Sequence, residues 1–301
     1  MGISAGGTAS RAVVEAPAKL NIHLTITARR PDGYHELISV MVPVSLADRI
    51  EVQAGPGEGI ELYCSGRPVP GDETNLVWQA ARAFLSKSGL RHGVSIRLHK
   101  EIPVAAGLGG GSSDAAAVLI GLNEAWPGRL KAADLYETAL ELGSDVPFFL
   151  SAVPSLVRGI GEDLESLDYW PDLWYVLVNP PVAISTAWVY RQVEIGLTRP
   201  EKDYIFKALN QDTFSVFDLL ENDLEHVTEP RFPVVTRIKE ALLEAGAEGA
   251  LMTGSGPTVF GVFRAKSEAE AAAKRLILQD LGDVFVTNNW SGERFGGTRD
   301  G

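Results

Sequence analysis

The segment from Pro103 to Ala117 places four glycines within five residues, at 107–111, and then continues into two serines and a run of alanines. Glycine lets the backbone adopt positive φ and approach a ligand closely, and the first turn of a following helix offers unpaired N–H groups to an anion. We therefore predict a phosphate-binding loop that leads into a helix over 112–125. The alternative is a tight loop that needs glycine only for steric reasons.

The loop departs from the common phosphate-binding motifs. No Lys-Ser or Lys-Thr pair follows the glycines, as a Walker A loop requires. A dinucleotide fingerprint beginning at Gly107 and Gly109 would need its third glycine where Ser112 stands. The catalytic-loop and Asp-Phe-Gly motifs of protein kinases are also absent from the sequence. These mismatches argue against the common NTPases, an unrelated oxidoreductase and a protein kinase.

The composition of the chain limits the ligands and partners. Its 301 residues, 45% of them hydrophobic and 22% charged, suit a globular protein of two domains. Its net charge of −12 argues against nucleic-acid and anionic-membrane partners, so a polyphosphate ligand needs local cations, helix N-termini and a divalent metal ion. The single cysteine, Cys64, fits a reducing cytoplasm and excludes a disulfide framework.

Residues 1–10 lack the apolar core of a signal peptide, and we expect them to form a disordered tail. No apolar run in the sequence reaches the length of a membrane span. From Leu20 to Ile26, apolar residues alternate with polar ones, which predicts a half-buried strand with Lys19, Asn21 and His23 on its polar face. A turn at 31–33 then separates this strand from a second alternating run at 40–44.

The rest of the chain is predicted as a mixture of helices and strands, which is an α+β pattern. Further strands are expected at 50–53, 60–64, 94–98, 156–158, 175–178, 250–252, 259–263 and 284–287. Helices are expected from 74 onward and at 132–142, 185–193, 204–209, 217–224, 234–245 and 267–280. A change of composition near Pro154 predicts an N-terminal domain over 1–154 and a C-terminal domain over 155–301.

Four segments together resemble the GHMP small-molecule kinases in kind and order. They are 17–21 (PAKLN), 107–117 (GLGGGSSDAAA), 143–149 (GSDVPFF) and 252–260 (MTGSGPTVF). Within that superfamily, the Asp-Gly-Tyr-His element at 32–35 resembles the kinases of 4-diphosphocytidyl-2-C-methyl-D-erythritol, in the non-mevalonate isoprenoid pathway. The resemblance implies a two-domain α/β sandwich: an N-terminal ATP-binding domain, a C-terminal ferredoxin-like substrate domain and a cleft between them.

The resemblance also implies a catalytic pair. Asp145 matches the carboxylate that accepts the proton of the substrate hydroxyl as it attacks the γ-phosphate, and Lys19 is its partner. A lysine beside Asp145 keeps the carboxylate ionised and offsets charge on the transferred phosphoryl group. Taken alone, Asp145 also fits a turn residue at a helix end, and Lys19 a solvated strand residue.

ATP is the expected phosphoryl donor, with Mg²⁺ arriving on its phosphates. No segment has dedicated metal-ligand spacing, so a hydroxyl of Ser112 or Ser113 is the expected protein contact to the metal. The resemblance places Asn75 and Lys100 near adenine and ribose, although a helix start and a strand end explain them equally well. The expected ATP-binding residues are Pro103, Ala105, Gly107, Leu108, Gly109, Gly110, Gly111, Ser112, Ser113, Asn75 and Lys100.

The acceptor is expected to carry a cytidine diphosphate, which needs a stacking ring and hydrogen bonds to the base edge. The predicted acceptor-binding residues are Asn21, Tyr34, His35, Thr186 and Tyr190. A supporting loop is expected at Gly254, Ser255 and Gly256, where a plain hairpin is the alternative. Thr253 and His23 depart from the commoner residues of the family, and neither is expected to touch the chemistry.

Two other functions remain open from the sequence. Another GHMP kinase, acting on homoserine, mevalonate or a sugar, would share Lys19, the glycine loop and Asp145 but would need no stacking pair. A non-catalytic nucleotide-binding protein on the same scaffold would have no reason to contain both Lys19 and Asp145. We expect a cytoplasmic monomer or weak homodimer.

Overall fold

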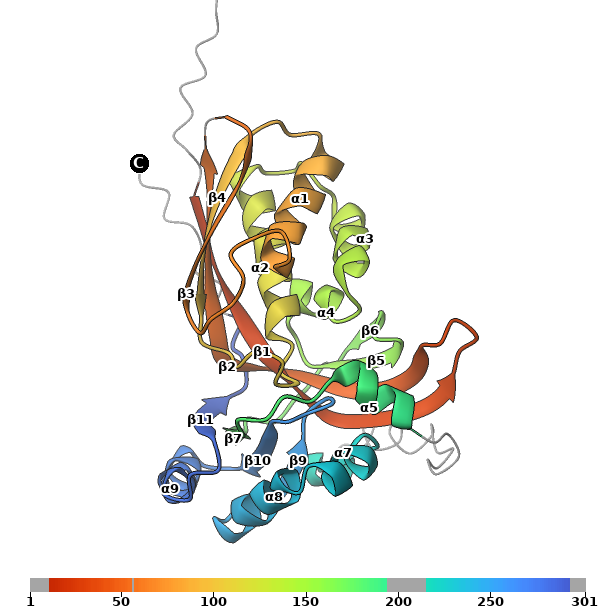
Figure 1. Ribbon diagram of the computed structural model, residues 1–301, viewed down its shortest axis with the longest axis vertical. Coiled ribbons are helices and arrows are strands. Elements are labelled where there is room, and N and C mark those ends of the chain that lie inside the picture. Colours follow the sequence, from red (N-terminus) through yellow and green to blue (C-terminus); the bar gives the residue numbers. More distant parts are fainter. Residues whose placement is uncertain (1–10, 56, 194–214, 293–301) are drawn as a thin grey trace, which may run out of the picture.

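The computed structural model describes residues 11–55, 57–193 and 215–292. The predicted tail at 1–10 and the predicted helix at 204–209 lie outside these ranges. In the described part, two β-sheets are stacked along the long axis of the molecule, each with its own set of helices (Figure 1).

The first sheet has seven strands and is built around one long antiparallel pair. That pair is β1 (Arg11–Arg29) and β2 (His35–Gly55). The other strands are β3 (Gly59–Gly66), β4 (Gly93–Lys100), β5 (Ser155–Gly159), β6 (Asp163–Ser166) and β8 (Glu221–Asn222). The two halves of β2 have different neighbours, because residues 49–55 pair with β4 and residues 37–41 pair with β5. The β1–β2 ladder therefore runs through both ends of this domain.

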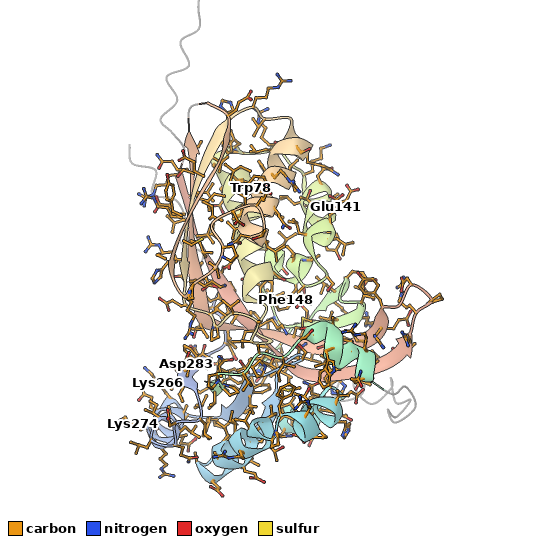
Figure 2. The ribbon with its side chains drawn as sticks, in the orientation of Figure 1. Trp78, Glu141, Phe148, Lys266, Lys274 and Asp283 are labelled. Carbon is orange, nitrogen blue, oxygen red and sulfur yellow. The ribbon has the colours of Figure 1, made fainter. Side chains whose placement is uncertain are left out.

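Four helices cover one face of this sheet (Figure 1): α1 (Leu76–Ser88), α2 (Gly110–Ala125), α3 (Ala132–Leu142) and α4 (Val146–Ser151). Helix α2 is apolar nearly all round, and Ala115, Val118 and Leu122 are fully buried, which is typical of a central helix. Phe148 of α4, labelled in Figure 2, is buried in the same core. Through this core, the sheet and α4 fix the position of the start of α2.

The second sheet has the order β11-β7-β10-β9, and its strands are β7 (Trp174–Asn179), β9 (Gly249–Met252), β10 (Val259–Phe263) and β11 (Asp283–Asn288). The helices of this half are α5 (Thr186–Gln192), the short 3-10 helix η1 (Val216–Leu219), α7 (Glu225–Arg231), α8 (Val234–Glu244) and α9 (Lys266–Ile277). Helices α8 and α9 pack against this sheet, whereas α5 lies beside the tip of the β1–β2 hairpin (Figure 1). The two sheets with their helices confirm the predicted α+β class.

The chain changes sheets later than the boundary predicted near Pro154. Strands β5 and β6 follow that position but extend the first sheet, and the second sheet begins only at Trp174. The predicted helix over 217–224 is instead η1 followed by the short strand β8, which pairs with β1. The long-range pairing with β1 overrides the local helical pattern there.

Strand β1 is also more buried than its alternation predicts. Lys19, Asn21 and His23 are only 4%, 1% and 2% exposed, so the expected polar face is covered by protein. The covering groups come from distant segments, such as the carbonyl oxygen of Leu219, which lies 3.0 Å from Nδ1 of His23. A solvated surface is therefore excluded as the explanation for these three polar residues.

Candidate active site

A cleft of about 1090 Å³ lies where the glycine loop, the β1–β2 hairpin, the junction of α3 and α4, and helix α5 meet. The structure brings most of the predicted site residues together there. Its lining includes Lys19, Asn21, Tyr34, His35, Asn75, Lys100, Pro103, Ala105, Gly107, Leu108, Gly109, Gly110, Gly111, Ser112, Asp145, Thr186, Tyr190, Gly254 and Ser255. Two predicted residues, Ser113 and Gly256, do not line it.

The glycine loop needs glycine because of its backbone geometry. Gly107 has φ of 78°, and a Cβ atom there would lie 2.2 Å from the carbonyl oxygen of Thr253. Gly109 caps α2 with φ of 70°, and a Cβ atom there would lie 2.8 Å from the ring of Phe149. Between them, the carbonyl oxygen of Leu108 accepts a hydrogen bond of 3.0 Å from the Lys19 amide. The loop is therefore tied directly to β1 and presents the N-terminus of α2 to the cleft.

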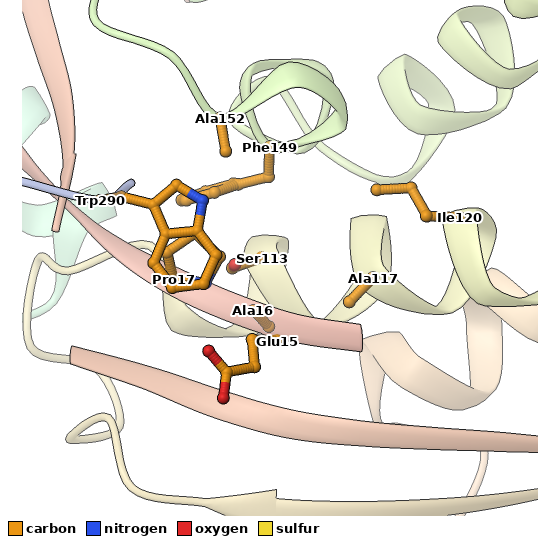
Figure 3. Close-up of a pocket in the computed structure, with 9 residues that line it drawn as sticks. All are labelled: Glu15, Ala16, Pro17, Ser113, Ala117, Ile120, Phe149, Ala152 and Trp290. Atoms are coloured by element: carbon orange, nitrogen blue, oxygen red, sulfur yellow. The ribbon is translucent and has the colours of Figure 1, made fainter. Parts of the chain in front are cut away.

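Ser113 lies on α2 but faces away from the cleft. It is 1% exposed and lines a separate hollow of about 10 Å³, which has room for one water molecule (Figure 3). Trp290 and Phe149 line the same hollow, and the Ser113 hydroxyl has no hydrogen-bond partner among the residues that the structure describes. Of the two serines predicted to contact a metal, only Ser112 lies at the cleft.

Lys19 is held in place by a buried polar network. Its ammonium donates a short hydrogen bond to Oδ1 of Asn21, whose Nδ2 donates to the Ser39 hydroxyl at 2.8 Å. The backbone N–H of Asn21 donates to Oγ1 of Thr253 at 3.0 Å. Thr253 is fully buried and does not line the cleft, so its connection to the site runs through Asn21. Burial lowers the pKa of Lys19, whereas the charge of Asp145 acts in the opposite direction.

Asp145 stands where α3 ends and α4 begins, and it is partly exposed to the cleft. Its charge opposes the lowering of the Lys19 pKa that burial causes. Burial is the larger cause of the raised pKa of Tyr190, and the charge of Asp145 adds to it. The carboxylate therefore acts electrostatically on both the lysine and the tyrosine. No ion pair joins Asp145 to Lys19 in the described ranges, which leaves its oxygens available to a substrate hydroxyl.

Lys100 lines the cleft but is only 4% exposed, which excludes the alternative of a solvated strand end. Its ammonium is buried and donates to carboxylates of Asp48 and Asp114, the latter at 2.7 Å. Burial raises the pKa of Asp114 well above its usual range, and the Lys100 charge opposes this shift. A Cβ atom on Gly110 would lie 2.8 Å from the Lys100 ammonium. This buried triad supports the glycine loop from below, and its ammonium is already bound by two carboxylates.

Asn75 is also engaged within the protein. Its Oδ1 accepts from the Val77 amide at 3.0 Å, as a helix N-cap does, and its Nδ2 donates to the carbonyl oxygen of Pro70 at 2.7 Å. Its side chain therefore acts first as the cap of α1, on the wall of the cleft.

The far end of the cleft contains the predicted aromatic pair. The rings of His35 and Tyr190 lie 5.5 Å apart between centroids, at an angle of 44°. Burial is the main cause of the lowered pKa of His35, and the nearby charge of Arg29 lowers it further. The ring is therefore neutral at pH 7 and can both donate and accept a hydrogen bond. Tyr34 is 61% exposed at the same end.

The supporting loop at 254–256 connects both ends of the cleft. Ser255 and Thr186 share a hydrogen bond of 2.8 Å between their hydroxyl oxygens. Nδ2 of Asn222 donates to the carbonyl oxygens of Met252 and Gly254 at 2.7 and 2.8 Å. Gly256 lies beneath the turn, where a Cβ atom would be 2.6 Å from the Met252 sulfur. Asn222 was not predicted as a site residue, because it falls inside the helix expected at 217–224 and belongs to none of the motifs.

Comparison with known proteins identifies the family. The model of the GHMP kinase N-terminal domain matches residues 75–152, and that of the GHMP kinase C-terminal domain matches residues 205–280. A protein of Geobacter metallireducens named 4-diphosphocytidyl-2-C-methyl-D-erythritol kinase is 46% identical, over 91% of this chain and 96% of its own length. The chain belongs to this family of GHMP kinases. It is a small-molecule kinase.

Other family members and solved structures agree. A protein of the same name from Pelotomaculum thermopropionicum is 47% identical, over 92% of this chain and 97% of its own length. A crystal structure of 4-(cytidine 5'-diphospho)-2C-methyl-D-erythritol kinase is 35% identical and superposes with a TM-score of 0.79, over 93% of this chain and all of that one. A homoserine kinase from Cytophaga hutchinsonii shares the fold, with a TM-score of 0.73 at 20% identity, over 96% of this chain and 98% of that one.

In the described ranges, no group of three His, Cys, Asp or Glu residues is positioned to hold a metal ion. Of the helices in those ranges, none has the length and apolar character needed to cross a bilayer.

Proposed function

We propose that this kinase transfers the γ-phosphoryl group of ATP to the 2-hydroxyl of 4-diphosphocytidyl-2-C-methyl-D-erythritol, in the non-mevalonate route to isoprenoids. The observation that carries this proposal is the placement of the His35–Tyr190 ring pair in the same cleft as Lys19 and Asp145. The names of the relatives give the same acceptor. A kinase for homoserine or mevalonate has no base to stack and no need for such a pair.

In the proposed reaction, the Asp145 carboxylate accepts the proton of the acceptor hydroxyl. The hydroxyl oxygen forms a bond to the γ-phosphorus of ATP, the bond from that phosphorus to the β–γ bridging oxygen breaks, and ADP leaves with the electron pair. The Lys19 ammonium stabilises the charge that builds on the transferred phosphoryl group. Its hydrogen bond to Asn21 fixes the ammonium before substrate arrives, so little reorganisation is required.

The glycine loop holds the phosphates of ATP in this proposal. Backbone N–H groups at the start of α2 face the cleft, as anion-binding helix N-termini do. Of the two serines predicted to contact the metal, Ser112 lines the cleft, and its hydroxyl is an oxygen donor that suits a Mg²⁺ ion entering with ATP. The ion would neutralise phosphate charge when bound. Lys100 acts beneath the loop, through the buried triad.

Acceptor recognition relies on the rings and on the α5 contacts. A neutral His35 matches the cytosine edge, which presents one amino donor next to one ring acceptor. Tyr190 provides a stacking surface, and Tyr34 provides a second one at the rim. Thr186 and Asn21 face the methylerythritol between the rings and Asp145.

A panel of alcohols tests the proposed function. We expect ATP-dependent phosphorylation of 4-diphosphocytidyl-2-C-methyl-D-erythritol, measured by ADP release with Mg²⁺ present, and at least about 100-fold lower kcat/KM for homoserine, mevalonate and galactose. Equal or better turnover of one of those three would contradict the acceptor assignment and leave the kinase class intact. Loss of activity with EDTA, restored by Mg²⁺, is expected for the metal.

We further propose that the enzyme works in the cytoplasm as a monomer or weak homodimer. Cys64 is a free thiol in the structure, which suits a reducing compartment. Sedimentation velocity at micromolar concentration should give a species near the 32.4 kDa of one chain. A tight dimer or larger assembly at that concentration would contradict the expectation.

A further inference from the structure

Four cationic side chains line the cleft, and they differ in what they already bind. Lys19 is hydrogen-bonded to Asn21 and acts with Asp145, and Lys100 is bound by two carboxylates. Arg29 and Arg191 line the cleft as well. In the parts of the chain that the structure describes, neither of these guanidinium groups has a carboxylate partner, whereas the neighbouring Arg30 pairs with Asp32 at 3.1 Å.

The two arginines come from the two elements that carry the ring pair, the β1–β2 hairpin and helix α5. Arg29 is the cross-strand partner of His35 in the β1–β2 ladder, so the two side chains stand on the same face of the hairpin. The effect of Arg29 on the pKa of His35 agrees with that closeness. Arg191 follows Tyr190 on α5 and lines the same end of the cleft.

The charge of the whole molecule makes this placement informative. With a net charge of −12, the protein repels any polyphosphate unless local cations reverse the field. At the inner end of the cleft, beside Asp145 and the glycine loop, the α2 N-terminus and Lys19 provide the local positive charge. The outer end is the one that contains His35 and Tyr190. At the outer end, the acceptor brings its own diphosphate, and the cations free to meet it there are Arg29 and Arg191.

We propose that Arg29 and Arg191 form a clamp for the diphosphate of the acceptor. This inference rests on the proposed function, because it assumes an acceptor that carries a nucleoside diphosphate. A guanidinium group presents paired N–H donors that match phosphate oxygens, and two of them, one from β1 and one from α5, would fix the direction of the diphosphate. The clamp would set the distance between the base at His35 and the hydroxyl at Asp145.

Competition by cytidine compounds tests the clamp. The inhibition constants of CDP and cytidine against the acceptor are measured for the wild type, for Arg29→Ala, Arg191→Ala and the double variant, and for Arg30→Ala as the control. Each single variant should raise the inhibition constant of CDP about tenfold, and the double variant should raise it further, because each substitution removes a charge-assisted contact. The inhibition constant of cytidine should change less than about twofold. Arg30→Ala, one residue away and outside the cleft lining, should behave as the wild type does.

The outcomes separate this inference from the proposed function. The clamp is contradicted if its variants raise the inhibition constant of cytidine as much as that of CDP, or if they leave the constant of CDP unchanged. It is also contradicted if Arg30→Ala raises the constant of CDP as much as Arg29→Ala does. The proposed function fails instead if the wild type does not phosphorylate the acceptor. A smaller rise of the acceptor KM with salt in the double variant than in the wild type would support the clamp independently.

Discussion

The two ends of the cleft are built from different kinds of contact. At the inner end, Lys19 and Asn21 are 4% and 1% exposed, and their polar atoms are fixed by hydrogen bonds that span the chain. At the outer end, Tyr34 is 61% exposed, and the ring contact of His35 with Tyr190 carries no hydrogen bond between them. Phosphoryl transfer needs preorganised charges, whereas recognition of a base and a diphosphate tolerates solvent. We therefore expect inner-end changes to reduce kcat or to raise the KM of ATP, and outer-end changes to raise the KM of the acceptor alone.

The largest effect is expected from Asp145→Asn. The amide cannot accept the proton of the acceptor hydroxyl, so kcat should fall about 10²- to 10⁴-fold with little change in KM. Glu141→Gln, an exposed carboxylate on α3 (labelled in Figure 2), is the matched control and should keep wild-type kcat. Steady-state kinetics checks both. Near-normal kcat in Asp145→Asn would make Asp145 a structural residue and remove the basis of the comparison.

A smaller effect is expected from Gly107→Ala, which tests whether the inner end is rigid. The new Cβ atom would lie 2.2 Å from the Thr253 carbonyl oxygen, so the loop must shift, and the KM of ATP should rise about tenfold or more. Gly128→Ala is the control, since Gly128 has φ of 75°, close to the 78° of Gly107, with open space around its Cβ position.

The two glycine variants separate backbone strain from the clash. Urea unfolding should show a loss of about 1–2 kcal/mol for Gly128→Ala, the cost of the left-handed conformation, and a larger loss for Gly107→Ala. Equal losses in the two variants, with an unchanged KM of ATP, would mean that the loop yields easily.

The smallest effect of the three is expected from Tyr190→Leu at the outer end. Loss of the stacking ring should raise the acceptor KM by about fivefold to tenfold and leave kcat and the KM of ATP within about twofold of wild type. Tyr190→Phe keeps the ring and should stay near the wild type. A fall in kcat for Tyr190→Leu that equals the fall for Asp145→Asn would erase the distinction between the two ends.

Local sequence signals were sufficient for much of the fold. The helix predicted at 132–142 has those bounds, and the helix predicted at 112–125 begins two residues earlier, at Gly110. Helix α4 was not predicted, although its Pro147 lies in the first turn, where proline is favoured. The short strand β8 was missed because its pairing with β1 joins residues about 200 positions apart, which no local pattern records.

In the candidate site too, contacts between residues far apart in the chain were not predictable from local sequence patterns. The motifs indicated Lys19, Asp145 and the glycine loop, and the structure places them around one cleft. The binding partners of Lys100 could not be predicted, because Asp48 lies 52 residues away and has no motif of its own. Likewise, nothing in the sequence separates Arg29 and Arg191 from the other arginines. Their place on the lining of the cleft is a property of the fold.

The β1–β2 ladder has a consequence for how such kinases change substrate. One strand, β1, carries Lys19 in its interior and Arg29 at its tip, and the two halves of β2 are anchored to different strands. Residues 29–35 can therefore vary in length or sequence while the register around Lys19 is held by the rest of the sheet. For protein engineering, the hairpin tip is an exchangeable module. Grafting the tip of a relative with another acceptor is a route to a new specificity that leaves the phosphoryl-transfer centre intact.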